Sequence, residues 1–168
     1  MGAARRFRYA CIMMNVIAIP TELAAAARSS ASDAQGNALE AEVQTSAGNP
    51  CRHCLRRANA GERLTLFSHS PFDRQNPYKE HGPIFVHSDG CERYATPHEL
   101  PADFVDRPIV LRAYDREQRI ARVAVVVDGA TQLRAEQLLS DPEIAFLHAR
   151  SFTHGCFLFR IEREAAAL

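Results

Sequence analysis

The sequence has no tryptophan, no net charge and no long hydrophobic run. Its 168 residues include 20 basic and 20 acidic side chains. A neutral protein lacks the positive field that supplies most of the affinity for nucleic acids, so a nucleic-acid partner is not expected. The apolar stretch at residues 9–20 is interrupted by Asn15 and is too short to span a bilayer, so a membrane partner is not expected either.

The sequence also lacks the short motifs that mark common active sites. It contains no nucleophile elbow, no phosphate-binding glycine loop and no dinucleotide fingerprint. With 46% apolar and 24% charged residues, its composition is that of an ordinary globular protein. A chain of this length buries a core without the help of metal or disulfides. Composition therefore predicts one globular domain and names no activity.

Five cysteines are present, which is an odd number, and two of them form a C-x-x-C motif. This usage fits a reducing cytoplasm with metal or thiol chemistry better than a secreted disulfide framework. The N-terminus offers an alternative, an exported protein, because residues 5–27 loosely resemble a signal peptide. We expect instead that residues 1–13 are a non-native or disordered extension and that translation starts at Met13 or Met14. Residues 14–168 would then form a single cytoplasmic domain.

Local patterns predict an α+β fold, mainly an antiparallel sheet with one or two short helices. A helix is expected at residues 20–28, capped by Thr21, and another at residues 131–139. The predicted strands are residues 64–68, 84–87, 109–114, 119–128, 144–150 and 156–163. Residues 29–50 are expected to form a loop with Val43 as its only anchor. The valines of residues 119–128 are expected to be covered on both faces of the sheet.

The strongest chemical signal is a C-x-x-C motif followed by an H-x-x-x-C motif. Together these motifs supply four candidate metal ligands, Cys51, Cys54, His87 and Cys91. Thiolate and imidazole suit zinc, and two short ligand pairs reduce the entropy lost on binding. This zinc-knuckle-like insertion predicts a structural zinc. Two alternatives remain: a redox-active C-x-x-C, which lacks the expected βαβ context, and reduced cysteines that pack as small hydrophobes.

Four other histidines lie close to these motifs or in polar loops. His53 stands between the first two cysteines and is expected either to be exposed or to contact the site from outside the ligand set. His69, His81 and His98 lie in polar segments and are expected at the surface. None of them is predicted as a metal ligand.

A second group of polar residues falls on two predicted strands near the C-terminus. Arg112 and Tyr114 are two apart on one strand, and His148 and Arg150 are two apart on another, so each pair faces one side. If the strands are neighbours, these four are candidate catalytic residues or a site for a small anion, with Cys156 nearby. The alternative is an ordinary polar face of a half-solvated sheet.

Three short segments are distinctive: NPCRHCL at residues 49–55, GPIFVH at 82–87 followed by Cys91, and LRAY at 111–114. Together with residues 61–62, 141–142, 148–151 and 155–157, they resemble the bacterial domain-of-unknown-function family 1203. The resemblance covers residues from about 16 to 163. It implies a small, single-domain bacterial protein in the cytoplasm and implies no activity.

The residues and the resemblance together favour a zinc-stabilised binding domain. Its partner would be an unknown protein or a small anionic ligand. The alternatives are a small enzyme that uses the polar Arg/Tyr/His face, and a C-x-x-C thiol redox protein.

Overall fold

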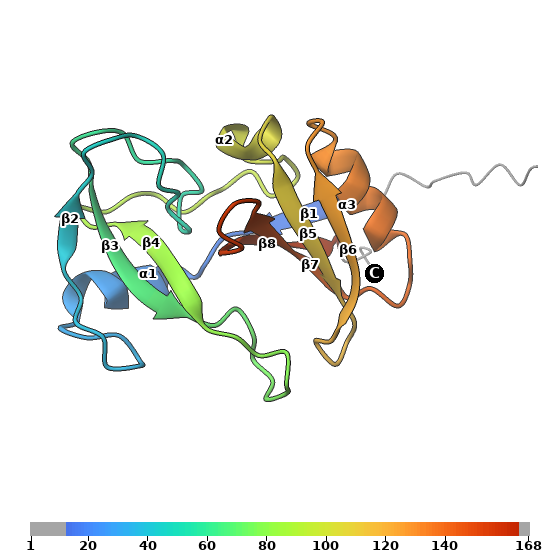
Figure 1. The fold of residues 1–168 in the computed structure, drawn as a ribbon, viewed down its shortest axis with the longest axis horizontal. Helices are drawn as coiled ribbons and strands as arrows, with labels where there is room; N and C mark the ends of the chain where they lie inside the picture. The colour runs from blue at the N-terminus through green and yellow to red at the C-terminus, as the bar shows by residue number, and fades with distance from the viewer. Residues whose placement is uncertain (1–12, 165–168) are drawn as a thin grey trace, which may run out of the picture.

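The computed structural model describes residues 13–164, which form two antiparallel sheets and three short helices (Figure 1). The predicted α+β class with mainly antiparallel sheet is confirmed. Residues 1–12 of the predicted N-terminal extension lie outside the described residues. Along the chain, the elements are β1 (Met14–Ile17), α1 (Thr21–Ser29), β2 (Ala41–Val43), β3 (Arg63–His69), β4 (Gly82–His87), α2 (Ala102–Val105), β5 (Ile109–Tyr114), β6 (Ile120–Val126), α3 (Thr131–Leu139), β7 (Phe146–Ser151) and β8 (Phe157–Arg163).

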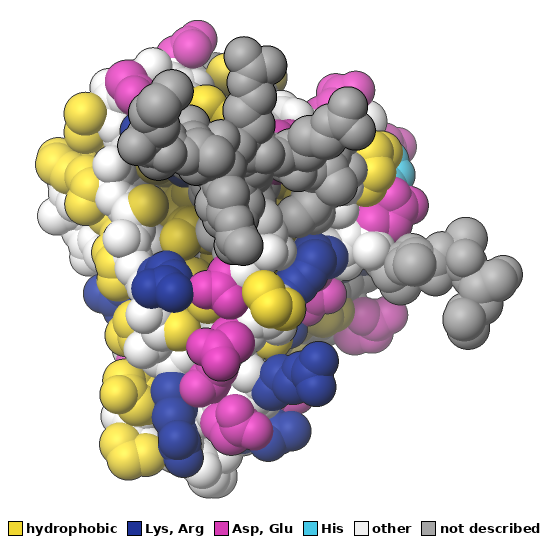
Figure 2. Space-filling view, turned by 90° about the vertical axis from the view of Figure 1, so that its right-hand side faces the viewer, with side chains coloured by type: hydrophobic (Ala, Val, Ile, Leu, Met, Phe, Trp, Pro, Cys, Tyr) yellow, Lys and Arg dark blue, Asp and Glu magenta, His cyan; other side chains and the backbone are white. Residues whose placement is uncertain are grey.

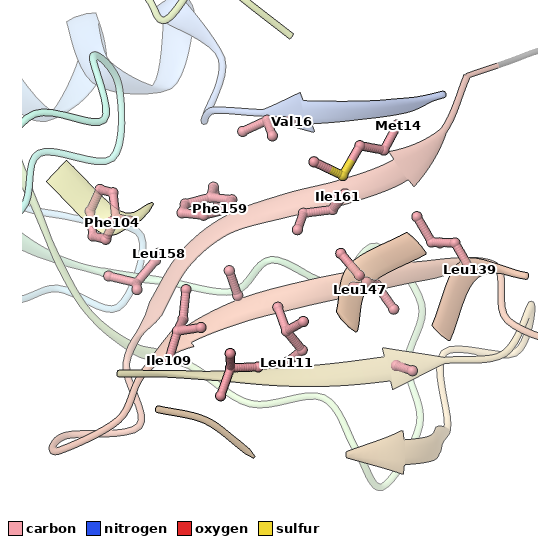
Figure 3. Packing of buried hydrophobic residues seen from close by; sticks show 14 of the residues in the cluster. Met14, Val16, Phe104, Ile109, Leu111, Leu139, Leu147, Leu158, Phe159 and Ile161 are labelled. Carbon is pink, nitrogen blue, oxygen red and sulfur yellow. The ribbon is translucent and has the colours of Figure 1, made fainter. Parts of the chain in front are cut away.

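The larger sheet contains five strands in the order β1-β8-β7-β5-β6, and α3 packs against it. Successive side chains of a strand point to opposite faces, so alternate residues of the central strands form the main core. Figure 3 shows this core, in which residues of β5, β7 and β8 meet α3 and β1. Its buried side chains include Met14, Val16, Leu111, Leu139, Leu147, Phe159 and Ile161.

The smaller sheet contains β2, β3 and β4, and α1 contacts β3. A second apolar cluster lies beneath it and includes Ile84 and Val86 of β4, Ala24 and Ala27 of α1, and Phe157. Because Phe157 belongs to β8 of the larger sheet, this cluster joins the two sheets. The chain between β1 and α1 makes a further link, since the Ile19 amide donates to the carbonyl of Arg52 at 3.1 Å.

Residues 14–19 form part of the fold. Met14–Ile17 pairs with β8 as an edge strand, and Met14, Val16 and Ile19 are buried. The sequence patterns did not predict this strand. None of the described helices is both long enough and apolar enough to cross a membrane.

The prediction for residues 119–128 is wrong in one respect. These residues do form a strand, but β6 lies at the edge of its sheet, and Val123, Val125 and Val127 are exposed. Val126 alone among these valines is buried, because its face of β6 packs on the main core. The side of the molecule that carries α3 and β6 shows basic and acidic side chains interspersed, as expected for a chain without net charge (Figure 2).

Two smaller predictions are also corrected. Thr21 does not cap α1: the N-cap residue is Pro20, and no side-chain capping bond is present. Val43 lies in β2 but is 60% exposed, so it does not anchor the segment. The anchor is Gln44 instead, which is buried and accepts a hydrogen bond from the Asn49 side chain.

Candidate metal centre

The four predicted ligands come together at one end of the smaller sheet. The ligand atoms of Cys51, Cys54, His87 and Cys91 all lie within 4.8 Å of one another. Cys51 and His87 are buried, and Cys54 and Cys91 are partly buried. Among the described residues, all cysteines are free thiols. The sequence therefore identified a real constellation of side chains.

A tight turn brings the first two ligands together. The Cys51 amide donates to the Arg56 carbonyl at 2.8 Å, and Leu55 adopts a left-handed φ of 55° that lets the chain reverse. Cys51 also pairs with Phe85 in an isolated bridge, which docks the turn on β4. His87 is the last residue of that strand, so the turn and His87 are fixed on one support. Cys91 follows Gly90, whose φ of 93° favours glycine.

Two of the distances between ligand atoms match those expected around a tetrahedral zinc. Zinc–sulfur bonds of about 2.3 Å in a tetrahedron place two sulfurs roughly 3.8 Å apart, and a sulfur and an imidazole nitrogen roughly 3.5 Å apart. Cys51 Sγ and Cys91 Sγ are separated by 3.8 Å. Cys54 Sγ and His87 Nδ1 are separated by 3.5 Å. Both distances match those of ligands around one ion, and the donor set is one that zinc prefers.

Glu62 orients the histidine ligand. Its Oε2 lies 3.2 Å from His87 Nε2, so Nδ1 is the nitrogen that faces the sulfurs. A carboxylate in this position fixes the tautomer and the orientation of a metal-bound imidazole. Glu62 is itself held by the Asn59 amide at 2.7 Å and by Arg56 at 3.3 Å. The Asn59 hydrogen bond is the main reason that the pKa of Glu62 is lowered.

Both ends of helix α1 are connected to Cys91 by side-chain contacts. At its start, the Thr21 hydroxyl lies 3.1 Å from His53 Nε2, and His53 Nδ1 lies 3.2 Å from Cys91 Sγ. At its end, Arg28 donates to Cys91 Sγ at 3.4 Å and to the His87 carbonyl at 2.8 Å. Hydrogen bonds of this kind stabilise a thiolate. His53 is 1% exposed, so of its two predicted positions the contact with the site is confirmed and the exposed one is wrong.

The proximity of the ligands strongly perturbs their protonation. Hydrogen bonds from the Cys54 and Cys91 thiols lower the pKa of Cys51, whereas the pKa of Cys91 is raised by its contacts with Cys51 and Cys54. Hydrogen bonds to the Cys51 and Cys54 sulfurs raise the pKa of His87 to about 10. Within this compact group the negative charge is therefore favoured at the Cys51 sulfur, and the Cys91 thiol keeps its proton. A divalent cation would take the place of the protons in this group.

The second predicted group also comes together, but not as an open face. Arg112 of β5 lies opposite His148 of β7, and the rings of Tyr114 and His148 are 4.8 Å apart. His148, Tyr114 and Arg150 are all buried. Phe72, from the segment between β3 and β4, covers the rings of Tyr114 and His148 at 5.3 and 5.1 Å. The expected half-solvated polar face is therefore wrong, because this segment covers it.

Glu80 of the covering segment pairs with both arginines of this group. It pairs with Arg112 at 3.4 Å and also with Arg150. Both ring nitrogens of His148 are buried without a hydrogen-bond partner among the described residues. Burial, followed by the charge of Arg150, lowers the pKa of His148 well below its usual value. The imidazole of His148 is thus enclosed, and the residue is 0% exposed.

Arg150 lines a cavity of about 200 Å³ together with Cys156 and His69. Cys156 is thus near the group, as expected. His69 is partly buried rather than a plain surface residue, and burial lowers its pKa to about 4. His81 and His98 are exposed, as predicted.

Two residues at the metal centre were missed by sequence reasoning. Glu62 stands eight positions after Cys54, and its contact with His87 follows only once β3 and β4 pair. Arg28 lies 59 residues before His87, and no local pattern connects the two. The helix prediction for residues 20–28 would have found Arg28 only if the docking of that helix had been known.

The family comparison covers the metal centre. A family model described as "Protein of unknown function (DUF1203)" matches residues 48–163. No curated protein matches the chain, and no solved structure does. The matched span contains all four candidate ligands and Glu62, whereas β1 and α1 precede it.

Proposed function

The chain belongs to the DUF1203 family of proteins of unknown function, and we propose that it is a binding domain stabilised by a structural zinc. The observation that carries the proposal is the group formed by Cys51, Cys54, His87 and Cys91, whose ligand atoms lie within 4.8 Å of one another. One histidine and three cysteines are a donor set typical of structural zinc sites.

The ligand count supports a structural role over a catalytic one. Four protein ligands complete a tetrahedron, whereas a catalytic zinc keeps one position for water or substrate. The surroundings agree with this, because Cys51 is fully buried and His87 is 5% exposed. Burial also speaks against a redox-active C-x-x-C, since the attacking thiolate of such a motif must be accessible.

The position of the site indicates what the zinc would stabilise. It would hold together the turn at residues 51–54, the end of β4 and the segment after it, and through Cys91 it would also hold α1. The binding free energy of a structural zinc is folding free energy for the segments that it joins. We infer that removing the metal loosens the smaller sheet first, because none of the four candidate ligands belongs to the core on α3, which meets the ligand turn only through Leu55.

Metal analysis of the purified protein and two cysteine variants tests the proposal. The wild type is expected to contain one zinc per chain, and Cys51→Ser to lose both zinc and stability. Cys156→Ser is the matched control, since Cys156 lies outside the group, and it is expected to keep its metal. A metal-free wild type with a reversible Cys51–Cys54 disulfide would overturn the proposal in favour of thiol redox chemistry.

A further inference from the structure

A cleft of about 370 Å³ lies between the smaller sheet and the turn that joins β7 to β8, the turn that faces the smaller sheet in Figure 1. Two arginines line it, Arg52 and Arg57, and no aspartate or glutamate does. Thr153 and Asn49 add polar groups. Its volume is within the range of sites for small organic ligands. Neither the metal centre nor the Arg112 and His148 group contributes a side chain to this cleft.

Arg52 is a buried charge without a carboxylate partner. It is 3% exposed, its Nε donates to the Phe157 carbonyl at 2.8 Å, and its Nη1 donates to the Pro50 carbonyl. Among the described residues it forms no salt bridge, and Nη2 has no acceptor. A buried charge normally requires a partner, so an anion in the cleft would supply what the protein does not.

Arg57 presents a second guanidinium to the same cleft. It is held in place, because its Nη1 donates to the Gly48 carbonyl and its guanidinium lies 5.5 Å from the centre of the Phe104 ring. The nearby Asp103 carboxylate accepts the backbone amide of Arg57 at 2.6 Å and makes no salt bridge with its side chain. A smaller neighbouring cavity is also lined by Arg57, and there Arg107 joins it.

We propose that this cleft binds a phosphate monoester with an apolar body. Two arginines that have no carboxylate partner match the two charges of a phosphate monoester at neutral pH better than the single charge of a carboxylate. The hydroxyls of Ser151 and Thr153 add donors for a third phosphate oxygen. Leu66, Phe85 and Leu158 line the same cleft and provide apolar contact for the rest of the ligand.

The turn of the candidate metal centre also orients Arg52 in this cleft. Arg52 stands between Cys51 and Cys54, so the turn that directs two sulfurs toward the metal also directs this guanidinium toward the cleft. The inference rests on the proposed function, because the zinc would hold the turn that positions Arg52. It adds the class of ligand that such a binding domain would bind.

Phenyl phosphate is a suitable probe, and backbone amide NMR reports where it binds. Saturable shifts are expected at residues of the cleft such as Gly48, Thr153 and His154, with benzoate binding at least about tenfold more weakly. Arg57→Gln is expected to weaken phenyl phosphate binding about tenfold or more, which is the cost of losing a charged hydrogen bond, and Arg57→Lys to weaken it less. Arg116→Gln, which removes the same charge from the exposed β5–β6 turn, is expected to change nothing.

Several results would overturn the proposal. They are the absence of saturable shifts at these residues, an Arg57→Gln affinity equal to that of the wild type, and benzoate binding as tight as that of phenyl phosphate. Zinc content is measured on each sample, so the two proposals fail separately. A folded, zinc-free protein that binds phenyl phosphate in the cleft overturns the metal proposal alone, and a zinc-loaded protein that does not bind it overturns the phosphate site alone.

Discussion

Glu62→Ala is the substitution that best isolates the metal centre, because Glu62 supports a candidate ligand without being one. Its Oε2 lies 3.2 Å from His87 Nε2, and the alanine variant removes this contact while leaving all four ligand atoms in place. Loss of such a supporting carboxylate lowers metal affinity by about 10- to 100-fold, or about 1.4–2.7 kcal/mol. Glu62→Gln keeps an acceptor but no charge, so its effect is expected to be smaller.

The other contacts of Glu62 determine how this effect is measured. Its salt bridge with Arg56 is exposed and contributes about 1 kcal/mol at most, and its hydrogen bond with the Asn59 amide supports the turn even without metal. Thermal unfolding alone would mix these losses with the metal effect. The assay is therefore a competition titration with a chromophoric chelator, which reports zinc affinity directly.

Asp89→Ala is the matched control for this experiment. Asp89 lies between His87 and Cys91 in sequence, is largely exposed, and pairs only with Arg63 at 3.2 Å. Its removal deletes one carboxylate close to the site without touching a ligand, so zinc affinity is expected to stay near the wild-type value. Equal affinity in Glu62→Ala and wild type, or an equal loss in Asp89→Ala, would refute the reasoning.

Two further predictions concern the larger sheet and are checked by urea unfolding. Leu147→Ala is expected to destabilise the fold by about 2–5 kcal/mol, because Leu147 is completely buried in the main core, whereas Val125→Ala on the exposed edge is expected to stay within about 0.5 kcal/mol. His148 has a pKa far below its unfolded value of about 6.5, so the unfolded chain binds the extra proton and stability falls as the pH drops below about 6.5. His148→Phe is expected to reduce this slope without loss of stability at neutral pH, leaving the parts due to His69 and His53. An unchanged slope would contradict the assignment of the slope to His148.

The four candidate ligands were predictable from sequence because each pair is local. A C-x-x-C needs one turn, and His87 and Cys91 need one strand end with a glycine after it, and both are visible in the residue order. The contacts that support the ligands are of another kind. Arg28 and His53 meet Cys91 only because α1 docks across the site, and that packing leaves no local pattern in the sequence.

In the larger sheet, too, local sequence patterns predicted the strands but not how they pack. Alternation identified β5, β7 and β8, and it put Arg112 and Tyr114 on one face of their strand and His148 and Arg150 on one face of theirs. That these two strands are neighbours is shown only by the structure. It does not say which strand lies at the edge, so the apolar run of β6 was assigned to a covered strand although Val123 and Val125 are exposed. It also does not say which segment covers a face, and a single Phe72 in a polar segment gave little sign that it would bury His148.

The segment between Cys54 and His87 connects the candidate metal centre to the buried group around His148 and Arg150. Its 32 residues are unusually many for a zinc knuckle. They contain β3, most of β4 and the segment that carries Phe72 and Glu80. That segment is fixed at both ends by the paired strands β3 and β4, and β4 ends at the ligand His87. If the candidate metal centre loosened, we expect Glu80 to shift as well, because its segment is held by the same strands. The ion pair between the Glu80 carboxylate and the buried Arg150 would then weaken. The buried charge of Arg150 in the larger sheet is thus paired only while the smaller sheet is folded. The stabilities of the two sheets are therefore coupled.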